Sequence, residues 1–87
     1  MQKLIVHRLY TEDVNRQAVT DILAKHLTSY TLIPAIGVWL NVAEQSLIIE
    51  VTGVPFAEVA RAATAIKEAN NQQAVLYTAS EVKTRLF

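Results

Sequence analysis

The side chains of this sequence that could do chemistry are few, and they do not form a catalytic set. The sequence has no Gly-rich phosphate loop, no H-E-x-x-H motif and no G-x-S-x-G nucleophile elbow. The two histidines, His7 and His26, lack a third ligand at a suitable spacing, and the absence of cysteine excludes disulfides and thiolate metal sites. We therefore expect no enzymatic activity, no metal and no cofactor. Both histidines should be packed or lie at an interface.

Basic and aromatic side chains are stronger candidates, because together they could bind a small anionic ligand. Cations pair with phosphate or carboxylate groups, and aromatic faces stack on planar rings. Near the C-terminus two basic residues lie two positions apart, so an extended chain would point both to one side. The candidates are Arg8, Tyr10, Trp39, Lys83 and Arg85.

Each of these candidates also has a purely structural interpretation. Arg8 interrupts an apolar strand and could pair with Glu50 on a neighbouring strand. Trp39 is the only tryptophan and could anchor the core or an interface. The charged tail could be a solvated face. Thr11 to Asp13 could likewise hold a metal or act as acids, but capping of the next helix is the better interpretation.

Length and composition limit the class of protein. The 87 residues suffice for one small domain, 1–87. Eight Lys and Arg balance eight Asp and Glu, which argues against nucleic-acid binding by phosphate neutralisation and against electrostatic membrane binding. No apolar run is long enough to span a membrane, and the N-terminus does not resemble a signal peptide. We expect a soluble cytoplasmic protein.

Residue patterns predict six elements in the order β-α-β-β-α-β. The expected strands cover 3–10, 31–40, 45–51 and 74–79. A first helix begins after an N-cap at Asn15, with Asp13 as the alternative cap, and ends near Ser29. A second helix begins with Pro55 in its first turn and stops before 70–73. The fold class is therefore α+β and ferredoxin-like, with both helices on one face of a four-stranded antiparallel sheet.

The strand TLIPAIGVWL, 31–40, carries a proline and a glycine that help to place it in the sheet. Right-handed crossovers give the spatial order 4-1-3-2, so this second strand lies at an edge, where Pro34 is tolerated. Gly37 could mark a bulge. A short hairpin connection is expected at 41–44.

Two further features favour contacts with another chain. The hydrophobic content is 52%, slightly above the usual about 45–50%, and the predicted central strands are apolar on both faces. We therefore expect a homo-oligomer. The tail 80–87 has the alternation of a strand, although Ser80 could instead cap a short helix. Its apolar end, Leu86 and Phe87, is expected to dock somewhere.

The whole pattern resembles the PII signal-transduction proteins and their CutA relatives. CutA proteins carry a similar Ile-Pro and glycine run ending in tryptophan, and Gly37 corresponds to a glycine at the foot of the PII nucleotide site. The resemblance implies trimers whose sheets pack inward and adds Gly37 to the candidate ligand residues. The long PII loop is replaced by NVAE, the lysine-containing loop by NNQQ, and the CutA cysteine is absent. Neither ATP binding nor a metal role is therefore carried over residue by residue.

Two functions from different classes remain. The first is a homo-oligomeric binding protein, a trimer by resemblance, that holds a small anionic ligand or signalling nucleotide between subunits without catalysis. The alternative is a protein-interaction module that binds a partner chain through the edge of strand 31–40 or through the tail. ACT-type sensor domains share the element order, and small phage proteins that sequester signalling nucleotides share the size.

Overall fold

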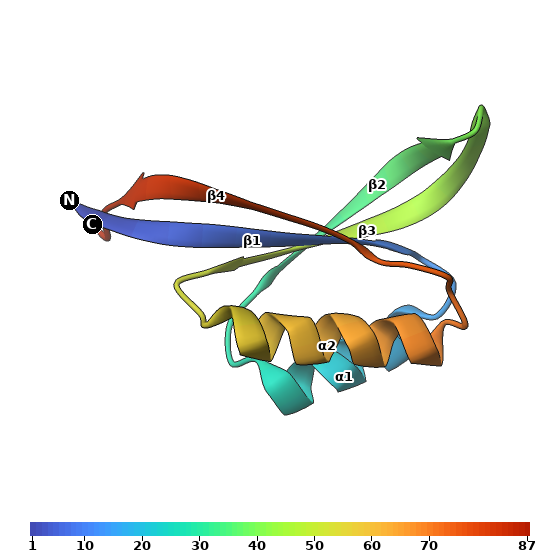
Figure 1. Cartoon of the computed structure of the whole chain (residues 1–87), viewed down its shortest axis with the longest axis horizontal. Helices are drawn as coiled ribbons and strands as arrows, with labels where there is room; N and C mark the ends of the chain where they lie inside the picture. Colours follow the sequence, from blue (N-terminus) through green and yellow to red (C-terminus); the bar gives the residue numbers. More distant parts are fainter.

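The computed structural model describes all residues, 1–87, and contains the six elements in the expected order (Figure 1). The strands and helices are β1 Gln2–Glu12, α1 Arg16–His26, β2 Thr31–Trp39, β3 Val42–Thr52, α2 Phe56–Ala69 and β4 Leu76–Thr84. The antiparallel sheet has the order β2-β3-β1-β4, which confirms the predicted strand order. Both helices lie on one face of the sheet. The predicted α+β, ferredoxin-like class is therefore confirmed.

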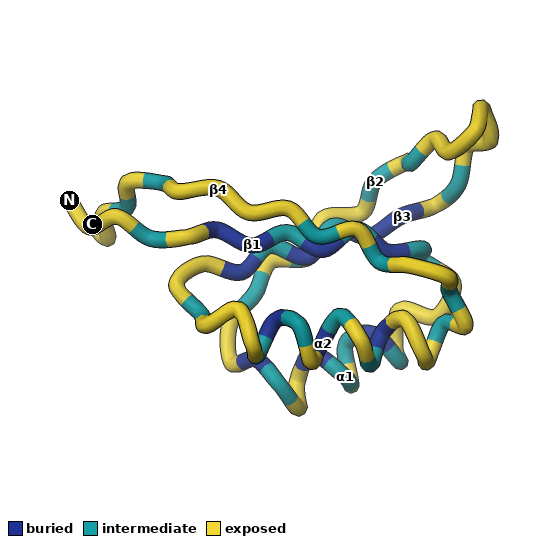
Figure 2. The backbone as a smooth tube through the Cα atoms, in the orientation of Figure 1, coloured by how far each residue is buried: buried dark blue, intermediate teal, exposed yellow.

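The core lies between the sheet and the two helices, as the buried segments in Figure 2 show. Leu9 from β1 and Leu47 and Ile49 from β3 are fully buried against the apolar stripes of the helices. The helices contribute Val19 and Leu23 from α1, and Val59, Ala62 and Ile66 from α2. The small Ala62 allows close packing of α2, and the burial of these side chains is what orients the helices on the sheet.

The β2–β3 connection is tighter than the sequence indicated. Trp39 pairs with Val42, so only Leu40 and Asn41 form the loop, and the predicted connection over 41–44 is wrong in its length. Both residues have positive φ, 49° and 65°, which are the backbone angles of a type I′ hairpin turn. This turn matches the twist of the two strands, which therefore pair up to the turn itself.

Residues around the edge strand confirm one prediction and overturn another. β2 pairs only with β3, so Pro34 does lie on an edge. The register of β2 runs without a break from Ala35 to Val38, so Gly37 forms no bulge. The glycine is required by side chains instead: a Cβ there would lie 2.7 Å from Ser46 Oγ.

The tail is a strand rather than a helix. β4 continues to Thr84 and pairs with β1 as far as Gln2, because alternating residues after Ser80 extend the ladder. The last two residues, Leu86 and Phe87, are fully exposed. The expected docking of this terminus therefore does not occur on its own chain.

The first helix begins as predicted. Asn15 is the N-cap, and its side-chain oxygen accepts a hydrogen bond from the Ala18 N–H at 3.1 Å. Thr11 and Glu12 belong to β1, so their expected capping role is wrong. Asp13 instead pairs with Arg16. Its hydrogen bond, and then its charge, raise the pKa of the Arg16 guanidinium.

The second face of the sheet is covered by no helix. Arg8 and Glu50, which are opposite each other in the β1–β3 register, form an ion pair there at 2.9 Å. The pairing expected as the structural alternative for Arg8 is thus observed. Neither helix has the length and the apolar character that a membrane crossing requires.

Candidate functional site

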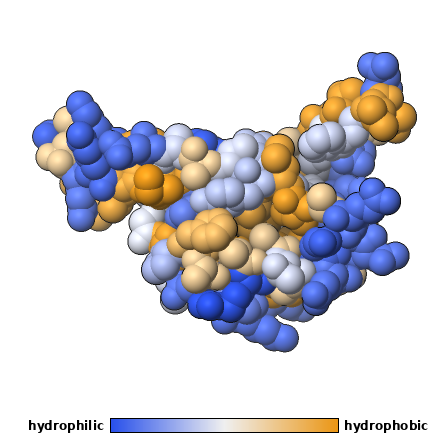
Figure 3. Space-filling model, in the orientation of Figure 1, coloured by the Kyte–Doolittle hydropathy of each residue, from blue (hydrophilic) through white to orange (hydrophobic).

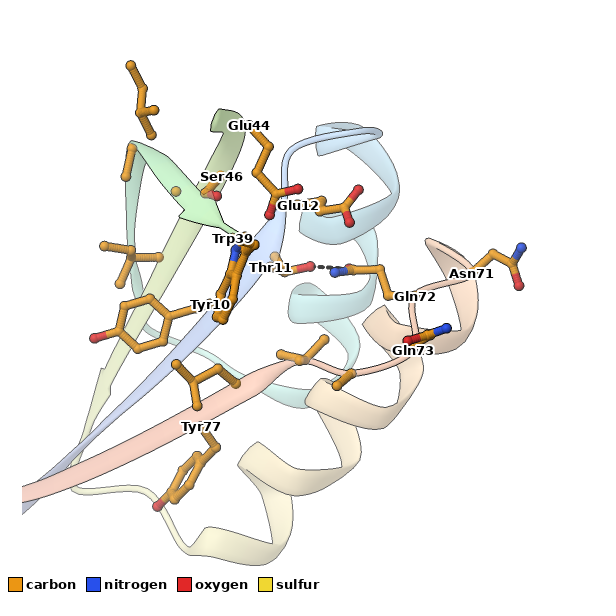
Figure 4. Close-up of a pocket in the computed structure, with 17 residues that line it drawn as sticks. Tyr10, Thr11, Glu12, Trp39, Glu44, Ser46, Asn71, Gln72, Gln73 and Tyr77 are labelled. Atoms are coloured by element: carbon orange, nitrogen blue, oxygen red, sulfur yellow. Dashed lines mark hydrogen bonds between the residues drawn. The ribbon is translucent and has the colours of Figure 1, made fainter. Parts of the chain in front are cut away.

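A cavity of about 820 Å³ lies where three segments meet, and it is the candidate functional site (Figure 4). Its walls are the end of β1, the outer half of the β2–β3 hairpin and the loop between α2 and β4. The last of these is the NNQQ stretch and the residues after it. The cavity thus joins residues from the start, middle and end of the sequence.

The Trp39 side chain forms one wall of the cavity. Gly37 leaves room for this side chain because it has no Cβ. A Cβ on Gly37 would lie 3.3 Å from the Trp39 indole nitrogen, closer than ordinary packing allows. The indole therefore folds back over the backbone of its own strand. Because Trp39 remains 53% exposed, one side of its ring is open to the cavity. A planar group could stack there.

A buried histidine positions another part of the cavity wall. His7 Nε2 donates to the Val54 carbonyl at 2.7 Å, because a carbonyl can only accept. Nδ1 is then the acceptor for the Tyr77 hydroxyl at 2.6 Å. The Tyr77 ring also meets Phe56 edge-on, with centroids 5.2 Å apart. His7 is therefore a packed residue, as expected, and it positions a tyrosine that lines the cavity.

Amide side chains hold the loop between α2 and β4. The buried Thr11 hydroxyl donates to Gln72 Oε1 at 2.5 Å, the dashed line in Figure 4. Asn70 Nδ2 donates to the same Gln72 oxygen at 3.1 Å, while Asn70 Oδ1 is buried without a partner in the chain. These contacts fix the loop at the end of β1, where Gln73 is free to face a ligand.

The cavity carries negative charge. Its only ionisable groups with a formal charge near pH 7 are the carboxylates of Glu12 and Glu44, and neither forms an ion pair. Figure 4 shows the two carboxylates at the same end of the cavity. No lysine, arginine or histidine lines the cavity. One chain alone therefore offers hydrogen-bonding groups and aromatic surface, but no cation for an anionic ligand.

Comparison with known proteins identifies the architecture. Neither a protein-family model nor a curated protein matches the chain. Among solved structures, a DUF3240 family protein from Shewanella baltica has 16% identity and a TM-score of 0.71, covering 100% of this chain and 98% of that one. CPII, a nitrogen regulatory PII-like protein from Thiomonas intermedia solved with ADP, AMP and bicarbonate, has 15% identity and a TM-score of 0.68, covering 99% and 98%. The fold is PII-like.

A third neighbour, the B. subtilis GlnK–ATP complex, has 17% identity and a TM-score of 0.62, covering 92% of this chain and 82% of that one. The resemblance to PII proteins that the sequence indicated is thus confirmed for the architecture. At these identities the likeness concerns the PII-like fold alone, so the ligand of this chain has to be argued from its own residues.

The PII-like chain brings together only some of the candidate residues. Tyr10, Gly37 and Trp39 line the cavity. Arg8 lies on the uncovered sheet face, engaged with Glu50. Lys83 is opposite Lys3 in the β1–β4 register and Arg85 follows the last residue of β4, so both lie near the termini. Figure 1 shows the termini at the end of the sheet away from the β2–β3 hairpin.

The distance between the cavity and the two basic residues, Lys83 and Arg85, follows from the length of β4. Lys83 follows Leu76, which lies at the cavity, by seven positions along β4, which corresponds to about 23 Å of extended chain. Sequence reasoning also missed the polar lining, Glu44, Ser46 and Gln72 among it. The only sequence feature that pointed to this polar lining is the amide-rich stretch before β4. His26 lies at the end of α1, and no group of three His, Cys, Asp or Glu residues could hold a metal ion.

Proposed function

We propose that the chain is the subunit of a homo-oligomeric, non-catalytic binding protein. It holds a small anionic ligand, such as a nucleotide, in clefts between subunits. The observation that carries the proposal is the cavity itself, in which an open tryptophan face lies opposite a row of amide and hydroxyl groups. Pockets that combine apolar surface with a few placed polar groups are typical small-molecule sites.

The anionic part of the ligand needs cations that one chain does not supply at the cavity. Lys83 and Arg85 are exposed and lie too far along β4 to reach the cavity of their own chain. In an oligomer they would come from a neighbouring copy. Charge-assisted hydrogen bonds of this kind are worth roughly 1.5–3 kcal/mol each.

The solved neighbours support a nucleotide as the ligand. CPII was solved with ADP and AMP, and GlnK with ATP, and both share the PII-like architecture with this chain. Trp39 and Tyr10 supply aromatic surface that a nucleobase could use. The amides of Asn71, Gln72 and Gln73 supply donors and acceptors for its edges.

Titration calorimetry with a panel of nucleotides tests the proposal. Trp39→Ala should abolish stacking and weaken binding by about 5-fold to 150-fold, since a base–aromatic stack is worth about 1–3 kcal/mol. Lys83→Ala combined with Arg85→Ala should weaken binding by about two orders of magnitude or more. The matched control is Lys67→Ala with Arg61→Ala on the exposed side of α2, which should bind as the wild type does.

Oligomerisation is tested separately. Light scattering at micromolar concentration should give a trimer, because the uncovered sheet face carries apolar side chains such as Ile33 and Ile48 that another copy can cover. A stable monomer would contradict the clefts on which the ligand site depends. Tight binding of a nucleotide by the Trp39→Ala variant would place the ligand elsewhere.

A second function, a protein-interaction module, is favoured by the β2–β3 hairpin. Its outer end projects from the body and carries a hydrophobic surface just below a hydrophilic tip (Figure 3). Ile36, Val38, Leu40 and Val42 are all more than half exposed there. A partner chain could add to the free edge of β2 or bind the tail. A stable monomer that binds no nucleotide in the panel would favour this function.

A further inference from the structure

Two carboxylates of the cavity have no partner in the chain. Glu12 and Glu44 form no ion pair, and no lysine, arginine or histidine lines the cavity. Both side chains are partly buried, so water solvates them incompletely. A carboxylate accepts hydrogen bonds and cannot donate them. The part of a ligand that lies beside these groups must therefore offer hydrogen-bond donors.

A buried hydroxyl in the same cavity also lacks a partner. Ser46 is only 9% exposed and lines the cavity, yet its side chain forms no hydrogen bond within the chain. Buried polar groups are normally hydrogen-bonded, so an unpaired hydroxyl that faces a cavity indicates the position of a ligand group. Unlike the carboxylates, this hydroxyl can donate as well as accept.

The sheet register brings these groups together. Glu12 is opposite Ser46 in the β1–β3 ladder, and Glu44, two residues before Ser46, points to the same side of β3. Gly37 on β2 is opposite Glu44. A Cβ on this glycine would lie 2.7 Å from Ser46 Oγ, 3.3 Å from Trp39 Nε1 and 3.8 Å from Glu44 Cγ, so the hydroxyl, the indole and one acidic side chain surround a single point. Figure 4 shows all four side chains in the same part of the cavity.

The edge of a nucleobase stacked on the open face of Trp39 would meet these groups. Guanine is the only common base with two adjacent donor groups, N1–H and the N2 amino group, and its O6 acceptor lies beside them. Adenine and cytosine instead place a bare ring nitrogen next to their amino group, and that nitrogen would face a carboxylate as one acceptor against another. Uracil has a single N–H between two carbonyl groups.

We infer that the cavity selects guanine, with N1–H and the N2 amino group donating to the carboxylates of Glu12 and Glu44 and the Ser46 hydroxyl donating to O6. The inference rests on the nucleotide of the proposed function and names its base. Hydrogen bonds to a carboxylate are charge-assisted and therefore strong. The assignment also explains how an anionic ligand fits a negatively charged cavity: the neutral base meets the carboxylates, and the phosphate lies away from them.

Titration calorimetry of the full chain with GMP, IMP and AMP tests the base alone, because the three ligands carry the same sugar and phosphate. IMP keeps N1–H and O6 but lacks the N2 amino group. GMP should bind about 10-fold to 150-fold more tightly than IMP, since IMP loses one hydrogen bond to a charged group. AMP should bind more weakly than IMP, because its N1 opposes a carboxylate.

Two variants at the cavity separate the roles of the side chains. Glu12→Gln with Glu44→Gln should weaken GMP binding at least about tenfold without weakening AMP binding, because an amide can pair with adenine. Ser46→Ala should weaken GMP and IMP binding by about 2-fold to 12-fold and leave AMP binding unchanged, since only GMP and IMP have an O6 acceptor.

Asp21→Asn with Glu68→Gln is the matched control, because it changes the net charge equally at exposed helix positions outside the cavity. This variant should bind the three nucleotides as the wild type does. Circular dichroism checks that every variant folds. Ser46→Ala should melt as the wild type does, since the Ser46 hydroxyl has no partner in the chain to lose.

Equal affinity of the wild type for GMP and AMP would overturn the inference and leave the proposed function intact. A preference for GMP that survives both cavity variants would overturn it as well, because guanine would then be selected by other groups. A chain that binds none of the nucleotides would refute the proposed function, and the choice of base with it.

Discussion

Replacement of His7 by phenylalanine should destabilise the protein strongly, although the new side chain is apolar and similar in size. His7 is 4% exposed and contacts two segments far away in the sequence. Its ring donates to the Val54 carbonyl at 2.7 Å and accepts from the Tyr77 hydroxyl at 2.6 Å. His7→Phe leaves both of these groups without their partner.

The expected loss is about 2–4 kcal/mol, since a buried polar group without its partner costs about 1–3 kcal/mol and Tyr77 can partly turn to water. A domain of 87 residues has a total stability of about 4–13 kcal/mol. The loss is therefore a large part of the total. For a domain of this size it lowers Tm by about 10–25 °C.

Urea denaturation, followed by circular dichroism at a fixed protein concentration, measures the loss. Tyr77→Phe should cost about 1 kcal/mol, because it removes one of the two hydrogen bonds. His26→Phe is the matched control and should change the free energy of unfolding by less than about 1 kcal/mol, since His26 makes no side-chain hydrogen bond. A His7→Phe variant within about 0.5 kcal/mol of the wild type would refute the assigned hydrogen bonds.

Three further changes test the local structure by the same unfolding measurement. Pro34→Thr should change the stability by less than about 1 kcal/mol, because β2 is an edge strand, and a large gain would contradict that position. Asn15→Ala should cost about 1 kcal/mol through loss of the cap on Ala18, and no loss would mean that the cap is unimportant. Leu40→Gly should stabilise the isolated subunit by up to about 1 kcal/mol, since leucine is disfavoured at its positive φ, and a loss of stability would contradict the type I′ turn.

Much of the fold follows from local patterns in the sequence. Alternating residues such as Leu47, Ile49 and Val51 have the period of a strand, and Val19 and Leu23 have that of a helix. The order of these elements, together with the handedness of the crossovers, was enough to predict the sheet order and the edge position of Pro34. These features depend on neighbours in the sequence and on general rules of chain geometry.

The ends of the elements could not be predicted as well, because pairing between distant strands decides them. The tail after Ser80 has both a strand and a helix interpretation when read alone. It becomes a strand because β1 extends to Gln2 and offers a partner for it. Gly37 likewise suggested a bulge, but the reason for the glycine is the approach of Trp39 and Ser46, which a sequence does not display.

The sequence by itself determined the residue types that could bind a ligand, and it indicated Tyr10, Gly37 and Trp39 for that role. Only the tertiary structure decided which residues share a cavity. The hairpin brings Glu44 to Glu12, while the length of β4 carries Lys83 to the other end of the molecule. The physical reason is that a strand advances about 3.3 Å per residue, so residues of one element are spread out and residues of different elements are brought together.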